Sequence, residues 1–288
     1  MDTHSAGEWD IHALQGRMLG SEELDALSNQ LGIKIPDCVF GNSIVSFQNP
    51  ASGFIYKFSA DKALEMCGFE ARTQKLYTEG ELKFDHINVI PNEVQVSMAS
   101  KWAAKTIPRD AAFATPHTPQ VPAEICSRGR DWTYSSPYKG TVEGIDGNPI
   151  PETVRIAITE EAIPYNMLGI ENPILWAHEV IFFEDELDDN GQSKFHIRVR
   201  AMQDCFYALI RSYLRVDHVV VRIMDTRVFH KFDERKILRE FQMREASYDE
   251  LRARGFNFPP QWAIDPRESD LIYERLPVIG IFRDEITY

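Results

Sequence analysis

The strongest constraint on the fold is a long β-hairpin pattern in the second half of the chain. Residues 176–187 form an extended apolar stretch that ends in acids, and residues 188–191 contain an Asn-Gly turn. After the turn, apolar and polar residues alternate in the order Phe195, His196, Ile197, Arg198, Val199 and Arg200. Because successive side chains of a strand point to opposite faces, this pattern predicts two long antiparallel strands.

The segments that follow the hairpin predict both helix and strand. Apolar residues between Phe206 and Leu214 recur with helical spacing, which predicts an amphipathic helix of about three turns with Asp204 near its cap. Alternation then predicts strands at 219–223 and 236–244. Two further helix starts are indicated by a capping box at Ser247 and Glu250 and by the sequence Asp-Pro-Arg-Glu at 265–268.

The first third of the chain carries similar signals on a smaller scale. A helix is predicted from an N-cap at Ser21 to a stop at Gly32. Residues 44–48 and 54–58 flank a predicted hairpin loop, and Ser59 is a predicted cap of a short helix. Hairpins with interspersed helices, rather than regular βαβ units, are typical of an α+β fold with a mostly antiparallel sheet core and peripheral helices.

The domain organisation depends on a Pro-rich stretch. Four prolines lie among Thr, Ala and Gln between residues 105 and 128. Such a stretch is either a domain linker or a surface loop. We favour the loop, because the strand-like segments on either side of it are too few to form two separate sheets. Residues 1–288 are therefore predicted to form a single compact domain.

Composition and charge exclude several classes of protein. The chain has 288 residues, 43% of them apolar, and a formal charge of −13. This acidity argues against a general nucleic-acid or anionic-membrane binder. The N-terminus lacks the features of a signal peptide, and no apolar run approaches the roughly 18 residues of a membrane span. Four widely spaced cysteines are read as reduced thiols, so we expect a protein of the cytoplasm or nucleus.

The charge is unevenly distributed along the sequence. Residues 194–244 contain 12 basic and 6 acidic residues, a net +6, which leaves −19 for the remainder. Alternation places Arg198, Arg200 and Arg222 at outward-facing strand positions. These arginines either belong to an ordinary solvated sheet face or line a basic groove for an extended acidic segment or a C-terminal carboxylate.

Familiar catalytic and metal-binding patterns are missing or incomplete. The pair His178-Glu179 would need a second histidine where Phe182 stands, and the acids before Gly191 lack the bidentate Glu of a calcium loop. No glycine-rich phosphate loop or nucleophile elbow occurs. Asp225 and His230 point to opposite faces if both lie on one strand. The sequence therefore predicts no catalytic residue, no metal and no cofactor.

Three long runs carry a family resemblance. They are DWTYSSPYKGT at 131–141, EVIFFEDELDDNG at 179–191 and YLRVDHVVVRIMDTRVFH at 213–230, and LREFQMRE and DPRESDLIYERLP follow in the same order. These runs resemble the TIPRL family, the Tip forty-one-like regulators of TOR signalling. The resemblance implies a compact α+β domain with a cleft and no catalytic activity of its own.

The resemblance also implies partners and contact residues. Family members bind the catalytic subunits of type 2A, 4 and 6 protein phosphatases, including the C-terminal tail, and work with the alpha-four (Tap-type) subunit. Contact positions carry over as Ile163, Ile223 and Asp225, with Arg227 beside Asp225. A further contact acid of the family falls at Lys62 here, with Asp61 as the neighbouring acid. In the first run, Trp132 and Tyr134 are predicted core aromatics and Lys139-Gly140 a turn.

Three functional hypotheses follow. The leading one is a non-enzymatic regulator that binds and restrains type 2A-family phosphatases in TOR signalling. The second is a scaffold or adaptor that bridges phosphatase complexes without inhibiting them. The third is a metal-dependent hydrolase built around His178, Glu179 or His230.

Overall fold

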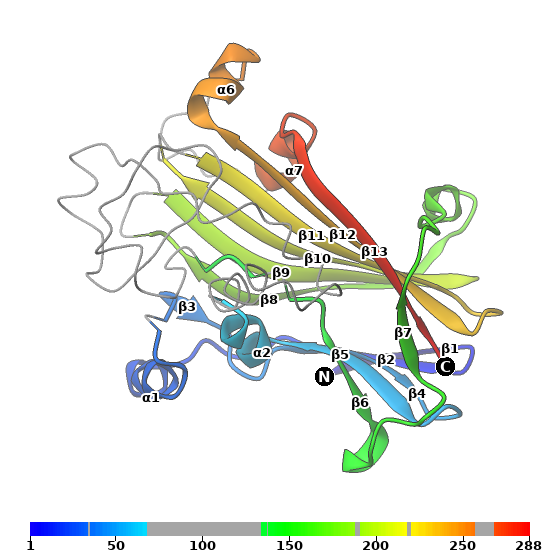
Figure 1. The fold of residues 1–288 in the computed structure, drawn as a ribbon. Helices are drawn as coiled ribbons and strands as arrows, with labels where there is room; N and C mark the ends of the chain where they lie inside the picture. Colours follow the sequence, from blue (N-terminus) through cyan, green and yellow to red (C-terminus); the bar gives the residue numbers. More distant parts are fainter. Residues whose placement is uncertain (34, 68–133, 137, 188–190, 218–219, 257–267) are drawn as a thin grey trace, which may run out of the picture.

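A computed structural model shows an α+β fold made mostly of two antiparallel β-sheets (Figure 1). The structure describes the chain except for residues 34, 68–133, 137, 188–190, 218–219 and 257–267. Within the described part, no helix combines the length and the apolar character that crossing a membrane requires.

The smaller sheet has five strands in the order β1-β2-β4-β5-β6. Its central hairpin joins β4 to β5, as the sequence predicts, with Val45 opposite Phe58. The strands are β1 (Asp2–Ala6), β2 (Trp9–Leu14), β4 (Ile44–Asn49), β5 (Phe54–Ser59) and β6 (Thr141–Gly144).

The larger sheet has eight strands in the order β3-β8-β9-β10-β11-β12-β13-β7. Its five central strands, β8 to β12, are long, and each pairs with the strand that follows it along the chain. The predicted hairpin forms the β8–β9 pair. The strands are β3 (Cys38–Val39), β7 (Arg155–Ile158), β8 (Ile174–Asp185), β9 (Gly191–Met202), β10 (Cys205–Val216), β11 (Val220–Lys231), β12 (Lys236–Ser247) and β13 (Val278–Thr287).

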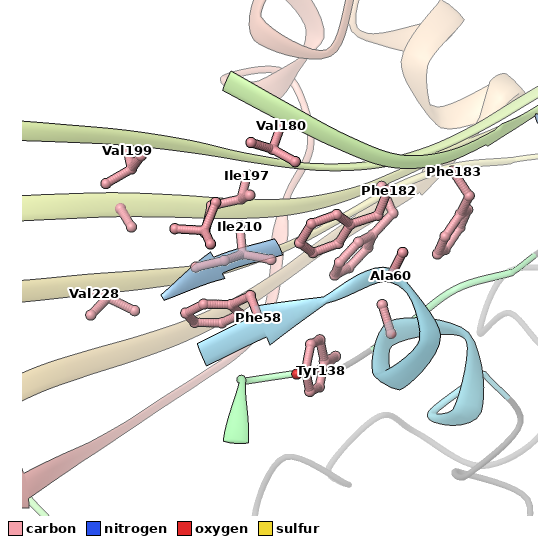
Figure 2. Close-up of a cluster of buried hydrophobic side chains, with 14 of the residues drawn as sticks. Phe58, Ala60, Tyr138, Val180, Phe182, Phe183, Ile197, Val199, Ile210 and Val228 are labelled. Atoms are coloured by element: carbon pink, nitrogen blue, oxygen red, sulfur yellow. The ribbon is translucent and has the colours of Figure 1, made fainter. Parts of the chain in front are cut away.

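The main core lies between the two sheets. One hydrophobic cluster contains Trp9, Phe47 and Phe58 of the smaller sheet together with Phe206 and Ile210 of the larger sheet. The rings of Phe47 and Phe206 stack with their centroids 4.5 Å apart, and Figure 2 shows Phe58 against the strands that carry Ile210. We call the face of the larger sheet that packs on this core the inner face, and the opposite one the outer face.

Helical segments lie at the periphery of the sheets (Figure 1). The first helix ends at the predicted Gly32, a left-handed C-cap, but its N-cap is Gly20 rather than the predicted Ser21, which is the first helical residue. The capping box at Ser247 and Glu250 is confirmed at the start of α6. The segments are α1 (Ser21–Leu31), α2 (Ala60–Glu65), η2 (Ile145–Gly147), η3 (Tyr165–Leu168), α6 (Tyr248–Ala253) and α7 (Glu268–Tyr273).

The predicted helix between Phe206 and Leu214 is wrong, because this segment is the central strand β10. Its even-numbered residues Phe206, Ala208 and Ile210 face the inner core, while Tyr213 packs in a separate cluster on the outer face. A strand that buries apolar side chains on both faces loses its period of two, and its apolar residues can then fit helical spacing by chance.

The outward position predicted for Arg222 is also wrong. Its side chain lies on the inner face and is 1% exposed. There its Nε donates to Glu245 at 2.6 Å and its Nη1 donates to Ser135 at 3.0 Å. The prediction failed because it assumed that an arginine on a strand faces solvent. An arginine can instead point into the core when a buried carboxylate on the next strand lies opposite it.

Several predictions fall outside the described residues. These are the Pro-rich stretch 105–128, Trp132, the turn residues 188–190 and the helix start at 265–267. Tyr134 is confirmed as a core aromatic, with 1% of its surface exposed. Gly140 takes a left-handed backbone conformation with φ +84°, which glycine adopts readily, but Lys139 and Gly140 lead into β6 without forming the predicted turn.

Candidate partner-binding site

The strand register places the predicted site residues of β11 on the outer face. Asp225 lies directly opposite Arg211 of β10 and Gln242 of β12. Two residues further along, Arg227 lies opposite Glu240. Because directly paired residues of neighbouring strands project to the same face, these side chains form one polar row across three strands.

Asp225 is the centre of this row. It is fully buried, and its carboxylate accepts two hydrogen bonds from Arg211: Nε to Oδ1 at 2.7 Å and Nη2 to Oδ2 at 2.8 Å. Arg227 Nη2 donates a third bond to Oδ2 at 2.9 Å. A buried carboxylate needs such partners, and the two-pronged contact with Arg211 fixes its orientation.

Arg227 connects Asp225 to the next strand. Its Nη1 donates to Glu240 at 3.2 Å and to Gln242 at 3.1 Å. Burial is the largest single effect on the Arg227 guanidinium and lowers its pKa, but the charge of Asp225 and the neighbouring tyrosines together outweigh burial, so the pKa is raised overall. Arg227 is therefore a permanently charged group held between two carboxylates.

Glu240 extends the row toward the sheet edge and η3. Its carboxylate accepts hydrogen bonds from Arg283 Nε at 2.7 Å and from the Tyr165 hydroxyl at 3.0 Å. Tyr165 is 47% exposed, so the row reaches the protein surface at this residue.

Helix α7 covers the other side of Asp225. Asp270 accepts hydrogen bonds from Arg211 Nη1 at 2.6 Å and from Arg198 Nη1 at 2.9 Å. The Tyr273 hydroxyl is hydrogen-bonded to Arg227 and to Gln242. The guanidinium carbons of Arg211, Arg227 and Arg244 lie 5.0, 5.4 and 4.0 Å from the centroid of the Tyr273 ring. Such distances are those of cation–π contacts.

The two predicted isoleucines lie in apolar clusters on the same outer face. Ile223 is fully buried in a cluster formed by β10, β11, α6 and α7, which includes Tyr213, Leu251, Ile272 and Leu276. Ile163, which is 3% exposed, packs with Met202, Cys205, Phe229 and Leu238 close to η3.

Four of the five predicted residues therefore share one face of one sheet, although Ile163 is far from the other three in sequence. Asp61 does not join them. It is an exposed residue of α2, whose Ala63 and Leu64 belong to the cluster between the two sheets. Figure 2 shows α2 with Ala60 beside that inner cluster. The structure thus separates Asp61 from the outer-face group.

Sequence reasoning missed the residues that hold this group together. Arg211 was hidden because its segment was read as a helix, whereas a strand assignment would have placed it beside Asp225. Asp270 and Tyr273 lie about 45 residues further along the chain than Asp225. Nothing in their local sequence indicates that they fold back over it, so only the three-dimensional structure could reveal them.

The residues of the hydrolase hypothesis do not form a site. His178 and Glu179 lie opposite Val199 and Arg198 and so point to different faces of the sheet. His230 lies on the inner face near Trp9 and Phe206, and burial lowers its pKa to about 4. Asp225 lies on the outer face, so the two cannot exchange a proton directly. Among the described residues, no group of three or more His, Cys, Asp or Glu side chains could hold a metal ion.

Comparison with known proteins gives a consistent result. The family model described as the TIP41-like family matches residues 38–252. The chain is 27% identical over 275 residues to the human TIP41-like protein, covering 94% of this chain and 84% of the relative. It is 31% identical over 288 residues to a TIP41-like protein of Arabidopsis thaliana, covering 94% and 86%.

A fungal relative adds a functional name. The Saccharomyces cerevisiae protein named type 2A phosphatase activator TIP41 is 28% identical over 280 residues, which covers 96% of this chain and 72% of that protein. The family match includes the strands β8 to β12 that build the outer face. This chain belongs to the TIP41-like family.

Proposed function

We propose that this protein is a non-enzymatic regulator that binds the catalytic subunit of type 2A-family serine/threonine phosphatases. In this proposal it contacts the extended C-terminal tail of that subunit, restrains phosphatase activity and acts in TOR signalling. Family membership supports the link to type 2A phosphatases, because relatives from Saccharomyces cerevisiae and Schizosaccharomyces pombe are named type 2A phosphatase activators.

One observation carries the proposed binding site. Ile163, Ile223, Asp225 and Arg227 come from two separate parts of the sequence and lie on the same outer face. Two apolar clusters flank the charged row, an arrangement that suits recognition of an extended segment by both apolar side chains and hydrogen bonds. Asp61, on α2, is a separate proposed contact.

The direction of regulation needs its own measurement. The names of the fungal relatives say that those proteins activate the phosphatase, whereas the proposal for this chain is restraint. A phosphatase assay at saturating concentrations of this protein distinguishes the possibilities. Lower phosphatase activity supports restraint. Higher phosphatase activity would mean that this protein is an activator, and unchanged activity would favour the adaptor hypothesis.

The binding site is tested with a matched pair of buried aspartates. Asp225 on the outer face and Asp284 on the inner face are both at most 5% exposed, and each accepts a two-pronged arginine contact. Isothermal titration with the purified catalytic subunit is expected to show weaker binding for Asp225→Asn and wild-type binding for Asp284→Asn. Ile163→Thr is expected to weaken binding as well.

The matched pair removes the ambiguity of a loss caused by unfolding. Both aspartate variants lose a buried ion pair, so both are expected to be destabilised to a similar extent. Equal losses of binding in the two variants would show that folding, rather than contact, is responsible. No binding by the wild-type protein would reject the proposed function.

The partner range is a further part of the proposal. We propose binding to the catalytic subunits of types 2A, 4 and 6, together with action beside the alpha-four subunit, in the cytoplasm and nucleus. Competition between the three purified catalytic subunits for this protein measures the preference among them.

A further inference from the structure

We propose that α7 is an autoinhibitory strap, which occupies the partner-binding face in the free protein and must leave it before a partner can touch Ile223 or Asp225. This inference rests on the proposed function for the identity of the partner. The strap itself is argued from contacts within the chain, and one arm of its test needs no partner.

The first step is the burial of the proposed contact residues. Ile223 and Asp225 are both 0% exposed. Ile272 of α7 and Leu276, just after it, share the apolar cluster of Ile223. Ser269 and Asp270 accept hydrogen bonds from Arg211, the partner of Asp225. Both side chains are therefore inaccessible to another molecule in the free protein, and α7 is one of the elements that cover them.

The second step is the way α7 is attached. A helix of six residues is unstable by itself in water, so α7 depends on its contacts with the sheet. These contacts are polar through Asp270 and Tyr273 and apolar through the buried side chain of Ile272. The Asp270 side chain is 44% exposed, so its ion pairs lie at the accessible edge of this attachment. By contrast, β11 is paired along its length with β10 and β12. The sheet therefore retains its own support when α7 detaches, which is the condition for local opening without global unfolding.

The third step is what α7 supplies to the sheet. Asp270 gives a carboxylate to Arg198 and Arg211, and Tyr273 gives an aromatic ring to three guanidinium groups. When α7 leaves, Arg198 and Arg211 lose the carboxylate, and Arg211, Arg227 and Arg244 lose the aromatic ring. A partner segment that carries a carboxylate and an aromatic ring would restore the same contacts, so α7 acts as an internal substitute for such a segment.

The partner-free arm of the test uses thiol labelling. Ile223→Cys places a thiol under α7, and Val228→Cys is the matched control, since it is equally buried on the same strand but on the inner face. Adding Asp270→Asn is expected to speed labelling of the first thiol roughly threefold to tenfold and to leave the second unchanged. Peptide mass spectrometry separates these sites from the native cysteines.

A second measurement covers the case in which a cysteine variant does not fold. Asp270→Asn in the otherwise native chain is expected to accelerate amide hydrogen exchange in residues 268–273 and to leave exchange in β11 unchanged. Acceleration in both segments, equal labelling increases at both thiols, or no change in either measurement would overturn the strap.

The partner arm measures affinity for the type 2A catalytic subunit. Asp270→Asn is expected to tighten binding roughly threefold to tenfold, because opening the strap raises the fraction of binding-competent protein. Glu274→Gln, a change at an exposed residue just beyond α7, is the control and should leave affinity unchanged. Weaker binding by Asp270→Asn would show that α7 is itself a contact surface and would overturn the proposal. If even the wild-type protein does not bind, the proposed function is rejected. The thiol-labelling experiment still tests the strap in that case, because it needs no partner.

Discussion

Asp225 is a structural residue as well as a proposed contact. Its carboxylate lies between two buried guanidinium groups at 2.7–2.9 Å. Replacement by Asn removes the negative charge but keeps the shape, so Arg211 and Arg227 remain buried with less compensation. We expect Asp225→Asn to lower the free energy of unfolding by roughly 3–5 kcal/mol.

Urea denaturation followed by circular dichroism measures this loss. The control is Asp233→Asn, which removes an exposed ion pair with Lys231 and is expected to leave the unfolding midpoint essentially unchanged. Equal unfolding midpoints for the two variants would contradict the role given to Asp225.

His230 predicts a pH dependence of stability. Burial lowers its pKa in the folded protein to about 4, below the ordinary value of about 6.5 expected when unfolded. Between these values the unfolded chain binds a proton that the folded protein does not. The contribution of His230 is therefore fully present above pH 6.5 and is lost as the pH falls toward 4.

The measurement is the free energy of unfolding of wild type and His230→Gln at pH 7 and pH 5. The wild type is expected to lose about 2 kcal/mol more than the variant over this interval. Burial also lowers the pKa of His196, so the variant should keep part of the acid sensitivity. An identical pH response in the two proteins would rule out the assignment to His230.

At the scale of elements, the approach to β6 depends on one glycine. Gly140 has φ +84°, and an added Cβ would lie 2.7 Å from the Tyr56 ring and 2.8 Å from the Phe58 ring. Gly147 has a similar φ of +76° but nothing within 4 Å of such a Cβ. Gly147→Ala thus isolates the backbone strain, about 1 kcal/mol, from the steric clash that Gly140→Ala adds.

We expect Gly140→Ala to be destabilised by roughly 2–4 kcal/mol, because Tyr56 and Phe58 are fully buried and cannot move away freely. Thermal unfolding of both variants gives the comparison. Similar melting temperatures for the two would show that the rings can accommodate the methyl group.

The elements also show where sequence patterns suffice. The β4–β5 and β8–β9 hairpins were predictable because one face of each strand is enriched in apolar residues and turn residues separate the strands. The β10 strand was not, because it is buried on both faces and its apolar residues match helical spacing. The prediction of one domain from 1 to 288, enlarged by a loop at 105–128, stays a prediction.

For the site, the sequence supplied four residues of one face but not their neighbours. A family resemblance named Ile163, Ile223, Asp225 and Arg227. The strand register explains why the three residues of β11 share a face, whereas Ile163 is placed there by its apolar cluster near η3. The pairing of Asp225 with Arg211 and the cover by α7 are long-range contacts. They depend on how the strands are ordered and on a helix that returns to the sheet, and neither is encoded in local periodicity.

At the scale of the whole molecule, the basic excess of residues 194–244 is largely neutralised internally. Arg211 pairs with Asp225 and Asp270, Arg227 with Glu240, and Arg239 with Asp284. Buried pairs of this kind contribute little to the long-range field that attracts an acidic partner. The alternative of an open basic groove is therefore not supported among the described residues of the outer face.

This neutralisation predicts weak salt dependence of partner binding. We expect the association rate constant with the type 2A catalytic subunit to fall by less than about threefold between 50 and 300 mM NaCl, because few unpaired basic groups remain on the outer face to attract an acidic partner. Stopped-flow fluorescence at several salt concentrations measures it, and Arg198→Gln, which removes a side chain that is 37% exposed, should reduce the small slope further. A fall of tenfold or more would instead show that the arginines act from an open surface, as an unpaired basic groove would.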